Sequence, residues 1–144
     1  MKVNLSLPFI LSLLLFILAL IFPPYCIENR CSDYLDSIGL VLIGWLSIFD
    51  NDLFICWLAN PLILLAWILP SFKVKRIFAL VAVLCALYFL NFETMIINEA
   101  GHKGQITSYG LGYYFWVASM LIYFIGTTII SLKYYQNTSD GAAR

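Results

Sequence analysis

Residues 111–132 contain no charged side chain and read LGYYFWVASMLIYFIGTTIISL. An α-helix needs roughly 20 apolar residues to cross about 30 Å of hydrocarbon, so this run is long enough for one crossing. Backbone amides in lipid must be paired within the protein, which favours a helix. The strands of a transmembrane barrel would instead alternate in polarity over about 10 residues. The stretch therefore predicts a membrane-spanning helix.

Three further apolar runs have a comparable length, at residues 5–22, 53–72 and 77–97. Together with 111–132 they predict an all-α fold, a polytopic transmembrane four-helix bundle. The second run contains Pro61, which removes a helix hydrogen bond, so we expect a kink between Cys56 and Asn60. The first run could instead be a cleaved signal peptide. An uncleaved anchor is favoured, because no small-x-small site precedes Pro23 and Pro24.

The composition agrees with a membrane protein of one domain. The chain has 144 residues, of which 62% are hydrophobic and 11% are charged. Soluble domains are nearer half apolar and a quarter charged, and a domain this small could not bury the excess. We predict a single membrane domain over residues 1–135 and a disordered cytoplasmic tail over 136–144. The formal net charge of zero gives no indication of nucleic-acid binding.

The charges separate into two groups once the four runs are drawn as spans. Lysine and arginine favour the cytoplasmic side, so both termini and the turn at 73–76 are predicted to be cytoplasmic. Basic residues dominate this side: Lys2, Lys73, Lys75, Arg76, Lys133 and Arg144, with Asp140 the one acid. Acids dominate the other: Glu28, Asp33, Asp36, Asp50, Asp52, Glu93 and Glu99, with Arg30 and Lys103 the bases.

The apolar stretch at 38–49 is too short to cross, since 12 residues of helix measure about 18 Å. We expect an interfacial helix on the outer side, or an extension of the second span. The alternative is a re-entrant half-helix whose tip carries Asp50 and Asp52. It is disfavoured because two carboxylates at membrane depth are costly without partners.

Small residues predict where helices approach each other in lipid. We expect a smooth face of the third span to meet a smooth face of the fourth, whose small residues recur every seven positions. The alternative role for these faces is a homodimer contact. The residues concerned are Ala79, Ala82 and Ala86 in the third span, and Gly112, Ser119 and Gly126 in the fourth.

Cys26 and Cys31 lie in the predicted outer loop after the first span, where a disulfide is favoured by an oxidising compartment. Two free thiols, or a bond to a partner protein, are the alternatives. Cys56 and Cys85 lie within spans and are interpreted as small packing residues. The chain has no Cys-x-x-Cys motif, so a membrane redox enzyme that passes disulfides to quinone is disfavoured.

Few polar residues are candidates for chemistry. His102 and Glu99 could form a metal or proton site, but a lone histidine favours a solvated loop residue. Asn60 and Asn91 are expected to form hydrogen bonds between helices. No catalytic residue, metal ligand set or cofactor motif is predicted. The polar residues singled out for a possible function are Asp50, Asp52, Asn60, Glu93, Glu99 and His102.

Two strings and a short segment carry a resemblance. They are WLANPL at 57–62, GLGYYFWVASM at 110–120 and Gly44-Trp45. Over residues 38–132 the chain resembles a loose group of small bacterial inner-membrane proteins that have no assigned activity. The resemblance implies a four-helix topology in the bacterial inner (plasma) membrane. It implies no functional residue.

These observations favour a non-enzymatic function. We expect an accessory or interaction protein, such as a subunit of a membrane complex or a protein that gives immunity to a membrane-targeting toxin. Its expected partners are the lipid bilayer and either another membrane protein or a second copy of the chain. A small transporter or channel component is the alternative, and a membrane thiol-redox protein is a third hypothesis.

Overall fold

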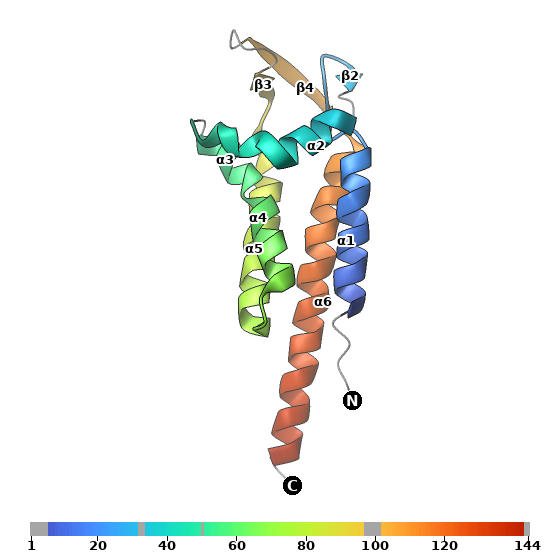
Figure 1. Cartoon of the computed structure of the whole chain (residues 1–144), viewed down its shortest axis with the longest axis vertical. Helices are drawn as coiled ribbons and strands as arrows, with labels where there is room; N and C mark the ends of the chain where they lie inside the picture. The colour runs from blue at the N-terminus through green and yellow to red at the C-terminus, as the bar shows by residue number, and fades with distance from the viewer. Residues whose placement is uncertain (1–5, 32–33, 50, 97–101, 143–144) are drawn as a thin grey trace.

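The computed structural model describes residues 6–31, 34–49, 51–96 and 102–142. The protein is mostly helical, and four short strands form a sheet at one end of a helical bundle (Figure 1). The N- and C-terminal ends of the chain lie toward the opposite end (Figure 1). We call these the sheet end and the terminal end. The prediction of an all-α fold is wrong in omitting the sheet.

The helices form an elongated bundle with one segment lying across it. Two helical stretches, Phe72–Asn91 and Leu111–Tyr134, are long and apolar enough to cross a membrane, and Leu7–Ile21, Ser37–Ile48 and Asp52–Ile68 are shorter apolar helices. The elements are α1 (Ser6–Ile21), α2 (Tyr34–Ile43), the 3-10 helix η1 (Gly44–Phe49), α3 (Asn51–Trp57), α4 (Ala59–Ile68), α5 (Phe72–Tyr88), the 3-10 helix η2 (Phe89–Asn91) and α6 (Leu111–Ala142).

The segment predicted to be interfacial forms α2 and η1, which we call the transverse segment. It runs across the bundle axis at the sheet end, whereas α1, α4, α5 and α6 run along that axis (Figure 1). The side chain of Ser37 fixes its start, because its Oγ donates to the carbonyl oxygen of Phe22 at 2.9 Å. A short apolar helix in this position does not need to span the bilayer.

Three predicted boundaries differ from the structure. The second run ends at Ile68, because Pro70 is followed by the start of α5 at Phe72. The third ends at Asn91, because the residues after it form a strand. The tail at 136–144 was predicted to be disordered, but α6 continues as helix to Ala142.

The predicted kink is confirmed. α3 ends at Trp57 and α4 begins at Ala59, so the break at Leu58 lies inside the predicted interval. Pro61 sits in the first turn of α4, where a backbone N–H has no helical partner to lose. The chain stays hydrogen-bonded across the break, because the Leu58 and Leu62 amides donate to the carbonyls of Phe54 and Leu58 at 3.0 and 3.1 Å.

The sheet joins two distant parts of the chain. Its strands are β1 (Tyr25–Ile27), β2 (Arg30–Cys31), β3 (Thr94–Ile96) and β4 (Lys103–Tyr109). Their order is β2-β1-β4-β3, and every pairing is antiparallel. Because β1 pairs with β4, the segment that follows α1 lies beside the segment that leads into α6. The connection between the third and fourth predicted spans, residues 98–110, is therefore a strand from Lys103 to Tyr109.

The β1–β2 hairpin has a two-residue turn with an unusual backbone. Glu28 and Asn29 both have positive φ, at 49° and 64°, which is the geometry of a type I′ turn. Asparagine adopts this region readily, whereas glutamate does so at a cost. Cys26 and Cys31 face each other in the register of the hairpin, and a disulfide joins them.

The bundle buries many small side chains together with several large ones, and it exposes many large apolar side chains. Ala79, Ala82 and Ala86 have no exposed surface, and Ile63, Met120 and Tyr123 are equally buried. The outer face carries large apolar residues from every long helix, such as Leu14, Ile68, Leu84 and Ile129, of which Ile68 is 80% exposed. Contact between these helices therefore combines close backbone approach with packing around a few large side chains.

The small-residue faces meet different partners from those predicted. The glycines of α6 contact α1, because a Cβ on Gly112 would lie 2.2 Å from the Phe22 carbonyl oxygen and one on Gly126 would lie 2.5 Å from Pro8 Cβ. The alanine face of α5 is buried, but α6 meets it through Tyr113, whose hydroxyl donates to the Ala86 carbonyl at 3.1 Å. The expectation that glycine face meets alanine face is therefore wrong.

Candidate functional site

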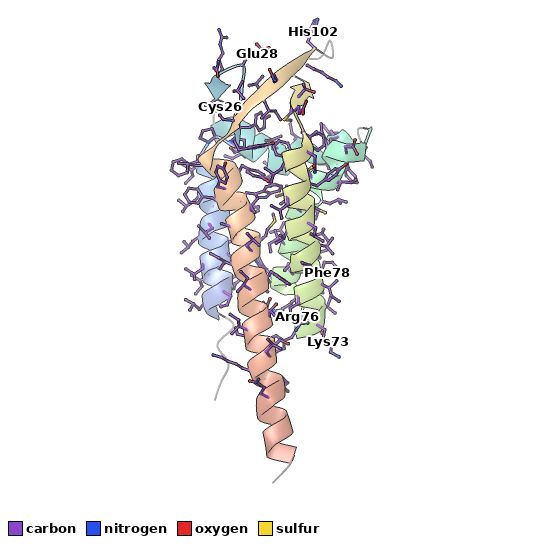
Figure 2. All side chains as sticks on the ribbon, turned by 180° about the vertical axis from the view of Figure 1, so that it is seen from behind. Cys26, Glu28, Lys73, Arg76, Phe78 and His102 are labelled. Carbon is purple, nitrogen blue, oxygen red and sulfur yellow. A yellow bond between two sulfur atoms is a disulfide. The ribbon has the colours of Figure 1, made fainter. Side chains whose placement is uncertain are left out.

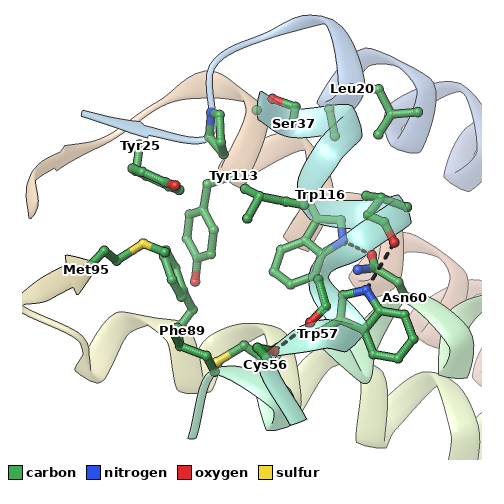
Figure 3. Close-up of a pocket in the computed structure, with 18 residues that line it drawn as sticks. Leu20, Tyr25, Ser37, Cys56, Trp57, Asn60, Phe89, Met95, Tyr113 and Trp116 are labelled. Carbon is green, nitrogen blue, oxygen red and sulfur yellow. Dashed lines mark hydrogen bonds between the residues drawn. The ribbon is translucent and has the colours of Figure 1, made fainter. Parts of the chain in front are cut away.

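An apolar cavity of about 160 Å³ lies at the sheet end, beneath the transverse segment (Figure 3). Its walls come from α1, the segment that leads into β1, the transverse segment, α3, α4, α6 and the segment that leads from η2 into β3. The cavity is thus a product of the whole fold rather than of one motif. Its lining residues are Ala19, Leu20, Pro24, Tyr25, Ser37, Leu40, Val41, Gly44, Ser47, Leu53, Cys56, Trp57, Asn60, Phe89, Met95, Gly112, Tyr113 and Trp116.

Trp57 links the transverse segment to α3. Its indole Nε1 donates to the carbonyl oxygen of Val41 at 3.0 Å, and its ring lies against Gly44. A Cβ on Gly44 would lie 2.4 Å from Trp57 Cδ1, so only glycine allows this approach. The Gly44-Trp45 segment therefore acts through its glycine, which brings the transverse segment down over the cavity.

Asn60 is the most polar side chain in the cavity wall. Its exposed fraction is 5%, and its Oδ1 accepts a hydrogen bond of 2.8 Å from Trp116 Nε1 on α6 (Figure 3). An indole nitrogen is only a donor, so the atom that faces it must be the amide oxygen. This contact fixes the orientation of the amide and directs Nδ2, which carries two donor hydrogens, away from Trp116.

The Nδ2 group of Asn60 has no hydrogen-bond partner among the described residues. No fully enclosed side-chain nitrogen or oxygen in the described ranges lacks a partner. It follows that Nδ2 is reached from the open space of the cavity that Asn60 lines. A buried amide usually forms its hydrogen bonds, so this donor is available to a bound molecule.

Three hydroxyl groups of the wall are already committed to the protein. Ser37 donates to the backbone of Phe22, and Tyr113 donates to the backbone of Ala86. Ser47 Oγ donates to the Gly44 carbonyl within its own turn. Compared with these three donors, Asn60 Nδ2 differs in having no partner within the described chain.

The predicted polar residues that the structure describes lie on separate elements. Asp52 lies in the first turn of α3, and its Oδ1 accepts a hydrogen bond of 3.2 Å from the Tyr88 hydroxyl. Glu93 and His102 are exposed at the sheet end, and Glu93 takes part in the sheet through its backbone carbonyl, which accepts from the Ile106 amide at 2.8 Å. Asp50 and Glu99, the remaining candidates, lie outside the described residues.

The two asparagines behave differently. Asn60 forms the predicted hydrogen bond between helices. Asn91 does not, because its Nδ2 donates to the carbonyl oxygen of Tyr88, three residues earlier, and its side chain is exposed. Within the described ranges, no three histidine, cysteine or carboxylate side chains gather closely enough to hold a metal ion.

The two ends of the bundle differ in charge. Lys73 and Arg76 lie near the terminal end, whereas Cys26, Glu28 and His102 lie at the sheet end (Figure 2). Arg76 also ties α5 to α6, because one guanidinium nitrogen donates to Ser131 Oγ at 3.2 Å. The basic turn at 73–76 thus lies at the terminal end, and the cytoplasmic orientation inferred from the charge pattern stays a prediction.

Sequence reasoning identified Asn60 but missed the cavity around it. Trp116 carried a usable signal, because an indole N–H in an apolar helix needs an acceptor and Asn60 is the amide within the second run. Phe89, Met95 and Tyr113 carried none, since aromatic and thioether side chains in apolar runs are usually packing residues.

No protein family, curated protein or solved structure matches the chain.

Proposed function

We propose that the chain is a multi-pass protein of the bacterial inner membrane, crossing four times with both termini in the cytoplasm. The supporting observation is the apolar exterior of the bundle, where leucine and isoleucine side chains are exposed on every long helix, while alanine and serine side chains are buried between the helices. A continuous apolar exterior is unfavourable in water. In lipid it costs nothing, and small residues are what allow helices to associate there.

The shorter helices fit this topology because they lie beside longer ones. α1 runs along α6, and α4 runs along α5, with α3 leading into α4 at the sheet end (Figure 1). The 16 residues of α1 measure about 24 Å, which a bilayer accommodates by modest local thinning. The transverse segment then lies at the outer interface, with Leu42, Ile43 and Trp45 exposed to headgroups and acyl chains.

The same protein is, in this proposal, a non-enzymatic accessory or interaction protein. Its outer end presents the edges of a small sheet, where β2 and β3 each have one side without a neighbouring strand. Sheet edges of this kind pair with strands of other proteins. The expected partner is a membrane protein or a second copy of this chain that contacts the outer sheet.

Cysteine labelling tests the topology. With Cys56 and Cys85 changed to serine, Ser71→Cys and Gln105→Cys each supply one free thiol at an exposed position near opposite ends of the bundle. A membrane-impermeant maleimide added to intact spheroplasts should label Gln105→Cys at once and Ser71→Cys only after lysis. Equal labelling of both before lysis would refute the proposed orientation.

Photo-crosslinking tests the interaction. A photoreactive residue at Thr94, on the edge strand β3, should give one discrete adduct, and the same residue at Leu84 on the lipid-facing side of α5 should give none. The purified partner should then bind the wild-type chain and lose affinity for Thr94→Pro. Flux of ions through liposomes that depends on Asp52 or Glu93 would instead favour the transporter hypothesis.

A further inference from the structure

We infer that the cavity at the sheet end binds the carbonyl-bearing part of a membrane lipid, with the lipid carbonyl accepting a hydrogen bond from Asn60 Nδ2. The inference rests on the proposed membrane topology, because a lipid must be present at the level of the cavity. It adds a specific ligand site to a protein for which the proposed function names only protein contacts.

The size of the cavity limits what it holds. Its volume of about 160 Å³ is close to that of an engineered apolar cavity of about 150 Å³ that takes up benzene. The occupant is therefore one ring or a short piece of acyl chain. A whole lipid does not fit, so the remainder must extend outside. Leu40 lines the cavity and is 37% exposed, which places one wall at the surface beside α2.

The chemistry of the wall requires a neutral ligand. None of the residues that line the cavity is lysine, arginine, histidine, aspartate or glutamate. A charged group placed there would lose its hydration without gaining a counter-ion. Apolar and aromatic side chains surround the space, and Asn60 Nδ2 supplies one fixed donor. The complementary group is a carbonyl oxygen on an apolar skeleton.

The position of the cavity favours a lipid as the source of that carbonyl. In the proposed topology, the transverse segment marks the outer interface and Asn60 lies just beneath it, at the start of α4. The ester carbonyls of phospholipids lie at this boundary between headgroups and hydrocarbon. The ring ketone of a lipid quinone has the same acceptor chemistry, so the experiment must separate the two.

Tryptophan fluorescence gives a direct measurement, because Trp57 and Trp116 both line the cavity. The full-length protein in detergent micelles is titrated with methyl decanoate and with a hydrocarbon of equal length. We expect the ester to bind about fivefold more tightly, which is the effect of one net hydrogen bond of about 1 kcal/mol. Equal affinities for the ester and the hydrocarbon would refute carbonyl recognition.

Two variants locate the binding. Asn60→Leu keeps the size of the side chain and removes the donor, so the preference for the ester should disappear while the hydrocarbon still binds. Val41→Phe fills the cavity and leaves Asn60 in place, so neither probe should bind. Thermal unfolding checks that each variant is folded. If Asn60→Leu does not fold, Val41→Phe decides, and unchanged binding by it would overturn the site.

Competition identifies the source of the carbonyl. A short-chain diacyl phosphatidylethanolamine and a decyl-substituted benzoquinone are each added to the wild-type complex with methyl decanoate. Displacement by the first assigns the site to a phospholipid ester, and displacement by the second to a quinone. Displacement by neither would overturn the assignment to a membrane lipid. All binding is measured in micelles, so none of these outcomes depends on how the protein is oriented in a membrane. A failure of the lipid site can therefore be distinguished from a failure of the proposed topology.

Discussion

The helical bundle and the sheet at its end are held together by opposite means. In the bundle, alanine, serine and glycine allow backbones to approach closely over long, regular helices, and many of the large apolar side chains are exposed. In the sheet, strands of two to seven residues are held by a disulfide and by pairings between residues about 80 positions apart. The comparison teaches that the bundle depends on small residues where its helices meet, and the sheet on closure of the chain.

The largest expected effect is at Gly112, which tests whether the bundle depends on close approach of its helices. Gly112→Leu puts a side chain where even a Cβ would lie 2.2 Å from the Phe22 carbonyl oxygen. We expect the free energy of unfolding, measured by titrating mixed micelles with denaturing detergent, to fall by about 3 kcal/mol.

The matched control is Gly39→Ala in α2, where an added Cβ would have no atom within 4 Å. Its stability should be unchanged or higher by up to about 1 kcal/mol, since alanine is the better helix former. An equal loss in both variants would show that α6 does not depend on close contact with α1.

The next largest effect is expected at the disulfide, which tests whether the sheet depends on closure of the chain. Changing both Cys26 and Cys31 to serine reopens a loop with a sequence separation of 5, which should cost about 2 kcal/mol. Hydrogen exchange should speed up in β1, β2 and β4 and stay unchanged in α5.

Cys85→Ser is the control, because Cys85 is a free thiol within α5. A double variant that keeps its stability but loses its biological activity would contradict a structural role for the bond. That result would revive the hypothesis of a thiol-redox protein.

Trp116 tests the junction between the two regions. Trp116→Phe leaves the Oδ1 of Asn60 without its donor in a site that is almost fully buried, which should cost about 1 to 2 kcal/mol. Trp67→Phe is the matched change in the bundle, where the indole donates to the Ser12 hydroxyl at 3.2 Å. A helical serine can turn to a backbone carbonyl, so this loss should be smaller, at about 0.5 kcal/mol. A larger loss of stability in Trp67→Phe than in Trp116→Phe would contradict a rigid junction between the bundle and the sheet.

The turn of the β1–β2 hairpin gives the smallest effect. Glu28→Asn places a residue that tolerates positive φ where glutamate is now strained, so stability should rise by about 0.5 kcal/mol. Asn29→Ala makes the opposite change next door and should lower stability by a similar amount. Chemical denaturation of the hairpin, followed through hydrogen exchange in β1, measures both. Equal signs for the two variants would contradict a type I′ turn.

The bundle could be predicted from the sequence because its signals are long. Two of the apolar runs gave helices that are long and apolar enough to cross a membrane, and the position of Pro61 gave the correct interval for the break between α3 and α4. The orientation inferred from the basic turn at 73–76 stays a prediction. The choice of partner faces was wrong, because the spacing of Gly112 and Gly126 shows that a close contact exists and does not show with which helix. Only the pairing of β1 with β4 explains why α1 lies against α6.

The sheet and the cavity could not be predicted, because their determinants are short and distant. Three residues such as Tyr25–Ile27 do not show an alternating pattern, and their partners lie in a segment interpreted as a loop. The cavity needs contributions from seven parts of the chain at once. Asn60 was identified as a polar residue that forms a hydrogen bond between helices, but its free Nδ2 follows from the orientation that Trp116 imposes.

The length of α6 has a mechanical consequence. Its helix continues from Tyr134, where the apolar stretch ends, to Ala142, which adds about 12 Å of rigid rod in the proposed cytoplasm. A protein or label attached near this point would rotate and tilt together with the membrane-embedded helices instead of swinging on a tether. A tilt of α6 by 10° in the bilayer would displace such an attachment by about 8 Å over the roughly 48 Å length of the helix. The rod would thus convert a small reorientation among lipids into a movement that another molecule in the cytoplasm can sense.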